Sequence, residues 1–439
     1  ERAAGIAGLS RVTVLTDQPD PVSRCVAEFT SAIPIEVVPL QSDPVSEAWH
    51  RRIARARAWA HSSWRGGLAG ASCYDQVLRP EQTLALLDRF ECDGAMIIGG
   101  TWTALDPTLS ARIIERHAES PEDRPLVFSQ AAPGHAPCLV SRVGLDRLIS
   151  MRERASHFAT LGGILSYVPA AATPDPIAAD ICIKIDPALR DASPVGVEEL
   201  LDLTLEITGS STCESGGERR GWWCGIEATP SPPMTLDTLR TLLDRTASHA
   251  PRPLAVTLAS RGGASCKGDP IRHPDFAGIL RILQTDPRVR FIHLRTDLAG
   301  PIDADLLASI ASVDVVSIDL LAQTEETYAR ISGHRCTLQS VLESAQLLHT
   351  RFQHDRVEGP LGTRAPAERW LVARLTRCDA TYEEIEGFYD HWVSLLGHAV
   401  IDPLPCALTG QRIAPLRTPA LARTRASQRL AFDSSGNEI

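Results

Sequence analysis

Apolar residues recur in short runs along the first part of the chain, and helix-like patterns separate these runs. The runs predict strands at residues 12–16, 35–40, 95–98 and 126–128. Apolar spacing predicts helices over residues 46–61, 80–91 and 107–119, the last with Asp106 as its N-cap and Pro107 in its first turn. Strands that alternate with helices in this way favour a mostly parallel sheet covered by helices on both faces.

A second series of elements begins at residue 201. Residues 201–208 alternate apolar and polar side chains with a period of two, which predicts a strand. Five further strands are predicted at residues 254–259, 290–296, 313–320, 370–376 and 398–403. Helices are predicted at residues 235–249, 275–285, 303–312, 324–332, 337–352 and 382–396. Six successive βα units predict right-handed crossovers and a parallel sheet that curls into a full or partial barrel, with ligand sites in the loops after the strand C-termini.

The two series divide the chain into domains. We expect an α/β domain over residues 1–169 and a linker over residues 170–197, which are rich in Pro, Ala and Asp. A partial TIM-like (βα)6 barrel follows over residues 198–405, and residues 406–439 begin a C-terminal extension. A length of 439 residues supports two or three domains. The chain opens without Met and stops just after a turn signal, so we expect a fragment at both ends.

Charge and cysteine content narrow the function classes. The net charge of −10, from 54 acidic against 44 basic residues, argues against a protein that coats nucleic acid. Eleven irregularly spaced cysteines favour reduced thiols and a cytoplasmic location. No run approaches the roughly 20 apolar residues of a membrane span. We therefore expect neither nucleic acid nor membrane as a partner, whereas a small-molecule ligand is compatible with the sequence.

Several motifs of the second series follow one another in a specific order. Residues 268–276 read Gly-Asp-Pro-Ile-Arg-His-Pro-Asp-Phe and follow the second barrel strand; residues 314–319 and 324–333 form the fourth strand and its helix. In this order they resemble the radical S-adenosylmethionine superfamily, and residues 386–392 and 432–436 resemble members with a SPASM extension. The resemblance implies S-adenosylmethionine and a [4Fe–4S] cluster as cofactors. It also implies cofactor-binding roles for Gly268, Asp269, Pro270 and Asp319.

The cysteine motif of that family is missing. The radical chemistry needs three thiolates, usually spaced Cys-x3-Cys-x2-Cys after the first strand, to hold the cluster. The corresponding loop here has only Cys213 and Cys224, and residues 416–423 of the SPASM-like tail contain no cysteine. Cys266 follows the second strand, and the loops after parallel strands open on the same face. Cys213, Cys224 and Cys266 are therefore the candidate metal ligands.

The first series resembles a truncated nucleotidyltransferase-like domain. The resemblance rests on residues 1–17 and on residues 101–107, which read Thr-Trp-Thr-Ala-Leu-Asp-Pro. The family's opening strand, Gly-rich loop and Lys would precede Glu1, and Thr101 stands where the family has a Mg²⁺-binding Asp. A hydroxyl is a poor substitute for a carboxylate on a hard cation. We therefore predict that this domain does not transfer nucleotides by itself.

Three hypotheses for function remain open, and the sequence does not decide whether the chain is an enzyme. The first is a degenerate radical S-adenosylmethionine-like protein that binds a ligand without catalysis. The second is an active radical enzyme with a non-standard iron–sulfur site, and the third is a nucleotidyltransferase whose catalytic loop lies upstream. Two residue roles are also open: residues 268–270 line a cofactor or form a tight βα loop, and Asp319 binds a ligand or caps the next helix. His273 is expected to satisfy backbone groups.

Overall fold

The chain forms two compact units. Unit 1 comprises Glu1–Ile53, Ser63–Glu198 and Val357–Pro366, and unit 2 comprises Ala54–Ser62, Glu199–Arg356 and Ala367–Ile439. The computed structural model describes residues 2–59, 72–154, 159–161, 181–190, 192–193, 195–196, 200–208, 232–249, 252–259, 268–332, 336–358, 365, 367–402 and 429–438. Within these ranges, no helix combines the length and the apolar character needed to cross a membrane.

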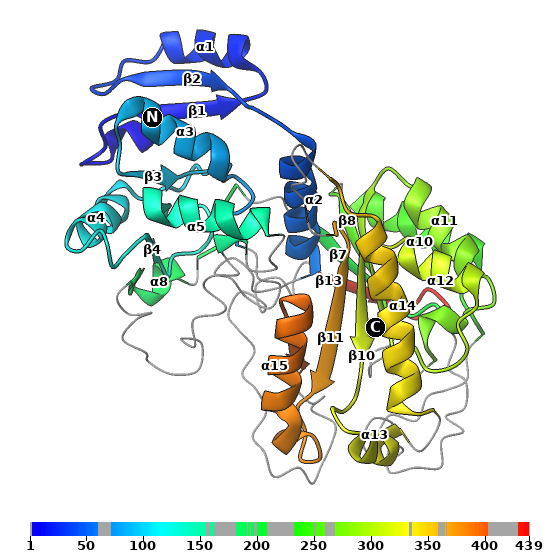
Figure 1. Ribbon diagram of the computed structural model, residues 1–439. Helices are drawn as coiled ribbons and strands as arrows, with labels where there is room; N and C mark the ends of the chain where they lie inside the picture. Colours follow the sequence, from blue (N-terminus) through cyan, green and yellow to red (C-terminus); the bar gives the residue numbers. More distant parts are fainter. Residues whose placement is uncertain are drawn as a thin grey trace. The chain divides into compact units, whose positions relative to one another are not determined.

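Unit 2 is built on a seven-stranded parallel sheet (Figure 1). Its strands are β7 (Leu201–Leu205), β8 (Leu254–Leu258), β9 (Val289–Thr296), β10 (Val315–Asp319), β11 (Trp370–Thr376), β12 (Val400–Asp402) and β13 (Arg429–Phe432). Their spatial order is β12-β11-β10-β9-β8-β7-β13, and every pairing between neighbours is parallel. The edge strands β12 and β13 do not pair with each other within the described residues, so the sheet is an open, partial barrel. The six predicted strands are confirmed, and β13 is an addition.

Helices follow the strands of unit 2 in chain order. They are α10 (Leu236–His249), η3 (Pro270–Arg272), α11 (Phe276–Thr285), α12 (Ala304–Ala311), α13 (Glu325–Ser332), α14 (Leu338–His354), η5 (Tyr382–Glu384) and α15 (Ile385–Leu396). Asp275, Asp303 and Thr337 are N-caps whose side chains each accept a hydrogen bond from a backbone N–H of the first turn. These caps explain why α11, α12 and α14 begin where the sequence predicts.

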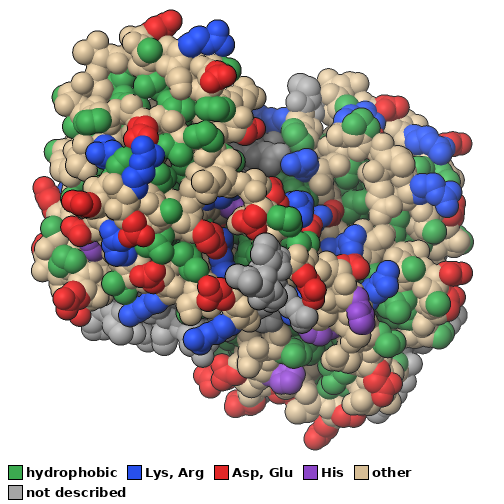
Figure 2. Space-filling model, turned by 45° about the horizontal axis from the view of Figure 1, so that its top comes forward, with side chains coloured by type: hydrophobic (Ala, Val, Ile, Leu, Met, Phe, Trp, Pro, Cys, Tyr) green, Lys and Arg blue, Asp and Glu red, His purple; other side chains and the backbone are tan. Residues whose placement is uncertain are grey.

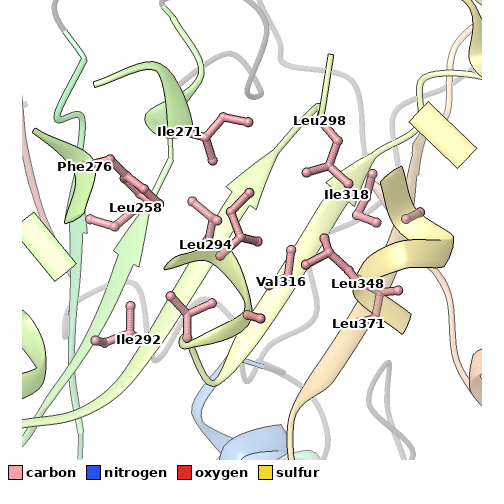
Figure 3. Close-up of a cluster of buried hydrophobic side chains, with 14 of the residues drawn as sticks. Leu258, Ile271, Phe276, Ile292, Leu294, Leu298, Val316, Ile318, Leu348 and Leu371 are labelled. Carbon is pink, nitrogen blue, oxygen red and sulfur yellow. The ribbon is translucent and has the colours of Figure 1, made fainter. Parts of the chain in front are cut away.

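One face of the seven-stranded sheet is apolar and packs against these helices. Alternate strand residues point to this face, and they include Leu258, Leu294 and Ile318, each at most 1% exposed. Figure 3 shows these side chains with Phe276 of α11 and Leu348 of α14 in one buried cluster. Burial of each large aliphatic side chain contributes about 1.5–3 kcal/mol. This apolar face therefore anchors the sheet and leaves the opposite face free for polar residues.

Unit 1 contains two smaller sheets. The first pairs β1 (Val12–Thr16) with β2 (Ile35–Pro39) in parallel. The second has the order β3-β5-β4-β6, with β3 (Gly94–Ile97), β4 (Leu126–Ser129), β5 (Cys138–Ser141) and β6 (Cys182–Ile183). The helices of the N-terminal segment are η1 (Ala3–Gly5), α1 (Pro19–Ala27), α2 (Pro44–Trp59), α3 (Pro80–Phe90), α4 (Pro107–Ala118), α5 (Arg142–Glu153) and α8 (Pro187–Arg190). Asp106 caps α4 as predicted, accepting from the N–H groups of Thr108 and Leu109.

The expectation of a mostly parallel N-terminal sheet is wrong for the larger of these sheets. Strand β5 runs antiparallel to both β3 and β4, and only the β4–β6 pairing is parallel. The reason is the short connection between β4 and β5, since a parallel crossover needs a dozen or more residues. Gly134 turns this connection with a φ of +85°, and the N–H of His135 donates to the carbonyl of Ala132. The chain therefore reverses direction and pairs antiparallel.

Acidic and basic side chains are mixed on the surface shown in Figure 2. Red and blue side chains alternate there over short distances, and neither sign gathers into one continuous field. Exposed ion pairs of the protein include Arg116 with Glu119 at 2.9 Å and Arg240 with Asp237 at 2.8 Å. Exposed pairs of this kind contribute little to stability, about 0–1 kcal/mol.

Candidate functional site

The face of the seven-stranded sheet opposite the apolar core is polar. Residues paired across neighbouring parallel strands share a face, so the register places Thr204, Thr257 and His293 together on β7, β8 and β9. The His293 ring lies between two hydroxyls. Its Nδ1 is 3.3 Å from Oγ1 of Thr257, and its Nε2 is 2.7 Å from Oγ of Ser317 on β10. A continuous polar surface therefore crosses the middle of the sheet.

Four charged side chains lie at the C-terminal ends of four consecutive strands on this face. Arg295 is near the end of β9, Asp319 ends β10, Arg374 is near the end of β11 and Asp402 ends β12. Nε of Arg295 donates to both carboxylate oxygens of Asp319, at 2.8 and 2.9 Å, and its Nη2 donates to Asp402 at 3.0 Å. Arg374 donates to the two oxygens of Asp402 through Nε and Nη2, at 2.9 and 2.7 Å. We call these four residues the charged quartet.

The charged quartet indicates that the sheet curves toward its polar face. Neighbouring strands lie about 4.8 Å apart, so β9 and β12 would be about 14 Å apart in a flat sheet. The 3.0 Å hydrogen bond from Arg295 to Asp402 spans this interval. Parallel βα barrels and open α/β sheets bind their ligands at the C-terminal ends of the strands. The charged quartet and the polar row behind it are therefore the candidate functional site.

The pKa values at this site follow from its packing. Burial alone would raise the pKa of Asp402, but the guanidinium groups of Arg374 and Arg295 lower it to about 2. Burial lowers the pKa of His293 to about 3, and the same two guanidinium groups contribute to the shift. Although burial opposes it, the carboxylates of Asp319 and Asp402 raise the pKa of Arg295. At neutral pH Asp402 is therefore a carboxylate, Arg295 is a cation and the His293 imidazole is neutral.

This arrangement is better suited to ligand binding than to proton transfer. A general base works best when its pKa is near the working pH, and the pKa of His293, about 3, is far below neutrality. The guanidinium and carboxylate groups of the quartet compensate each other. Other donors and acceptors on this face are the hydroxyls of Thr204, Thr257 and Ser317, the imidazole and the side chain of Asp202. The face therefore offers hydrogen bonds to a polar ligand.

Asp269 directs its carboxylate into the fold. The residue is 2% exposed. Its Oδ1 accepts from the N–H of Ile271 at 3.1 Å, and its Oδ2 accepts from the Thr296 hydroxyl and from the N–H of Asp297, both at 2.7 Å. Burial raises the pKa of Asp269 well above its usual range, and the neighbouring carboxyl of Asp297 raises it further. This side chain thus ties the loop after β8 to the end of β9.

The residues around Asp269 lie in the described part of the loop that precedes α11. Gly268 has a φ of +103°, in the left-handed region that favours glycine, and Pro270 begins η3. His273 joins this loop to the segment before α10, with Nε2 2.9 Å from the carbonyl of Met234, while its Nδ1 accepts from the N–H of Asp275 at 3.1 Å. The prediction that His273 satisfies backbone groups is confirmed. The cofactor-binding roles of Gly268, Asp269 and Pro270 stay a prediction.

The three cysteines proposed as metal ligands, Cys213, Cys224 and Cys266, lie outside the described residues. In the part of the chain that the structure describes, no three His, Cys, Asp or Glu side chains group into a metal site. The cysteines described there are free thiols. The described residues therefore do not supply the ligands of a [4Fe–4S] cluster.

The sequence analysis missed three of the four residues of the charged quartet. It selected Asp319 for its place at a strand end, but it left Arg295, Arg374 and Asp402 without a role. A signal was present: Arg374 stands between Ala373 and Leu375, and Arg295 follows Leu294, both near the end of a predicted strand. Charged residues at alternate positions of otherwise apolar strands indicate a polar sheet face.

Thr101 has a structural contact in unit 1. Its hydroxyl donates to the carbonyl of Gly196 at 2.8 Å, and Gly196 has a φ of +68°. A Cβ at Gly196 would approach the Thr101 carbonyl oxygen to 2.4 Å, so only glycine fits this close contact. The position that the family resemblance assigns to a Mg²⁺-binding Asp therefore joins two distant segments of unit 1.

Comparisons with known proteins give partial structural matches. No protein-family model and no curated protein matches the sequence. The crystal structure of Streptococcus suis SuiB matches with a TM-score of 0.37 and 9% identity over 55% of this chain and 60% of that chain. The structure of anSMEcpe with bound AdoMet matches with a TM-score of 0.35 and 12% identity over 46% of this chain and 50% of that chain. The chain thus spans no more than about 60% of these proteins.

Proposed function

We propose that this chain is a radical S-adenosylmethionine-like protein that has lost the standard cluster and binds a ligand instead of performing radical chemistry. The order of the sequence motifs after residue 200 and the open parallel sheet of unit 2 support the family resemblance. One observation carries the proposed loss of function. The two carboxylates expected at the cofactor, Asp269 and Asp319, already accept hydrogen bonds from donors of the protein itself.

The ligand of this protein would bind at the C-terminal edge of the seven-stranded sheet. A ligand that displaced Arg295 from Asp319 and Asp402 would have to replace three charge-assisted hydrogen bonds, which are among the strongest in proteins. We therefore expect the charged quartet to stay intact when a ligand binds. The quartet would fix the curvature of the sheet, while Thr257, His293 and Ser317 would offer the hydrogen bonds.

Anaerobic incubation with S-adenosylmethionine and a strong reductant tests this proposal. The protein is first reconstituted with iron and sulfide, and cleavage of S-adenosylmethionine is followed by chromatography. We expect no cleavage beyond that of a protein-free sample. Cleavage that Cys213→Ala abolishes and Cys336→Ala preserves would overturn the proposal, and it would favour an active radical enzyme with a non-standard iron–sulfur site. Cys336 is the matched control because it is not one of the proposed ligands and its thiol contacts the Tyr328 hydroxyl.

A further inference from the structure

Four buried nitrogen atoms in unit 1 lack hydrogen-bond partners among the described residues. They are Nε1 of Trp49, Nε2 of His50, Nε of Arg79 and Nη1 of Arg152. Trp49 and His50 lie on α2, Arg79 directly precedes α3, and Arg152 lies in the last turn of α5. Trp49 is 1% exposed and Arg152 is 5% exposed. Buried polar atoms almost always have a hydrogen-bond partner, so four unpaired nitrogen atoms in one unit need an explanation.

Direct contacts bring these four residues together. The guanidinium carbon of Arg152 lies 5.2 Å from the ring centroid of Trp49, and Nη1 of Arg79 contacts Nδ1 of His50. Helices α3 and α5 pack against each other. Burial lowers the pKa of His50 to about 3, and the guanidinium groups of Arg79 and Arg152 lower it as well. The imidazole is therefore neutral, and with Nδ1 accepting from Arg79 its proton is on Nε2. All four unpaired nitrogen atoms are thus N–H donors.

The acidic residues nearby do not satisfy these donors. Oε2 of Glu81 lies 3.5 Å from Nη1 of Arg152, which is longer than a normal hydrogen bond, and the Glu81 side chain is 48% exposed. Nε of Arg152 has a separate partner, the carbonyl of Ala159 at 3.4 Å. Burial lowers the pKa of both guanidinium groups, although Glu47 and Glu81 act against this shift for Arg79, and Glu81, Asp75 and Asp43 act against it for Arg152. Carboxylates thus lie near both cations, but the four nitrogen atoms have no hydrogen bond of normal length to them.

We propose that Trp49, His50, Arg79 and Arg152 form a binding site for a phosphate group. Guanidinium groups match the oxygen atoms of phosphate in charge and in geometry. Four N–H donors from three separate segments would have to share the two oxygen atoms of a carboxylate. A phosphate presents more oxygen atoms, arranged around one phosphorus atom. The group can come from inorganic phosphate or from a small phosphomonoester, and the chemistry at the site is the same. This site is in unit 1, so it is independent of the function proposed for unit 2.

Isothermal titration calorimetry of the full chain tests the site. Inorganic phosphate, glycerol 3-phosphate and acetate are each titrated at constant ionic strength. We expect saturable binding of at least one phosphate compound and none of acetate. Arg79→Lys keeps the charge but removes the planar fork, so it should weaken phosphate binding by about tenfold or more. The control Arg116→Lys changes an exposed arginine of α4 and should leave the affinity unchanged.

A second measurement covers variants that alter stability. Arg152→Met removes a buried cation and leaves the nearby carboxylates of Glu81 and Asp75 without it. In phosphate-free buffer we therefore expect its Tm to be lower than that of the unchanged chain. Phosphate should raise the Tm of the unchanged chain and not that of Arg152→Met. The proposal is overturned if neither phosphate compound binds, if acetate binds as well as phosphate, or if Arg79→Lys binds phosphate as tightly as the unchanged chain.

Discussion

Replacement of Arg295 by methionine should destabilise unit 2 strongly. The guanidinium group makes three hydrogen bonds to carboxylates, two to Asp319 and one to Asp402. Without it, Asp319, whose side chain is 6% exposed, would lose both of these hydrogen bonds, whereas Asp402 would keep both bonds from Arg374. Removal of one partner of a buried ion pair costs about 3–5 kcal/mol. Because the Arg295 side chain is 21% exposed, we expect a loss of about 3 kcal/mol.

Urea unfolding followed by circular dichroism measures this change, and a double-mutant cycle isolates the pair. Asp319→Asn removes the charge that Arg295→Met leaves behind, so the double variant should lose less than the sum of the two single variants, by about 1–3 kcal/mol. Arg240→Met is the control, since Arg240 pairs with Asp237 at an exposed position of α10 and should cost less than about 1 kcal/mol. Equal losses for Arg295→Met and Arg240→Met, or strictly additive losses in the cycle, would refute the structural role of the quartet.

Three further predictions concern acid stability, a helix cap and nucleotide chemistry. On folding, the pKa of His293 falls from 6.5 to about 3 and that of Asp402 falls from 3.8 to about 2. Stability should therefore fall with decreasing pH, first from about pH 6.5 to 3 and then further toward pH 2. In unfolding curves measured at several pH values, His293→Asn should remove the first part of this loss, which is at most about 5 kcal/mol. An unchanged pH profile for this variant would contradict the assignment. Asp106→Ala should cost about 1 kcal/mol in thermal unfolding because α4 loses its N-cap, and a loss near zero would show that the cap is not needed. The chain should release no pyrophosphate from CTP and Mg²⁺, because Thr101 replaces the expected metal-binding Asp; robust release would revive the nucleotidyltransferase hypothesis.

The strands of unit 2 were predictable because their two faces differ. In β7 and β8, leucine and valine at alternate positions pack into the core, and this period is visible in the sequence. Strand β13 (Arg429–Phe432) was missed because four residues are too few to reveal a period. It belongs to the sheet only through its parallel pairing with β7, a contact between residues more than 220 positions apart. Sequence pattern thus locates strands that carry their own periodicity and misses those that depend on a distant partner.

The candidate site was less predictable than the fold. Strand-end position drew attention to Asp319, but the bond from Arg295 to Asp402 depends on the curvature of the whole sheet. Asp269 makes a similar long-range contact, because the Thr296 hydroxyl that donates to it lies on the next strand. Family resemblance predicts that these carboxylates lie near a cofactor, whereas no local pattern encodes their hydrogen-bond partners.

Iron and sulfide content after anaerobic reconstitution is the most direct test of the lost cluster. The chain and a Cys213→Ala/Cys224→Ala/Cys266→Ala variant are reconstituted in parallel, desalted, and assayed for iron, labile sulfide and visible absorbance. We predict that both samples retain no stoichiometric iron and show identical, featureless visible spectra. About four iron and four sulfide ions per chain, lost in the triple variant, would contradict the account and show that these three thiolates hold a [4Fe–4S] cluster.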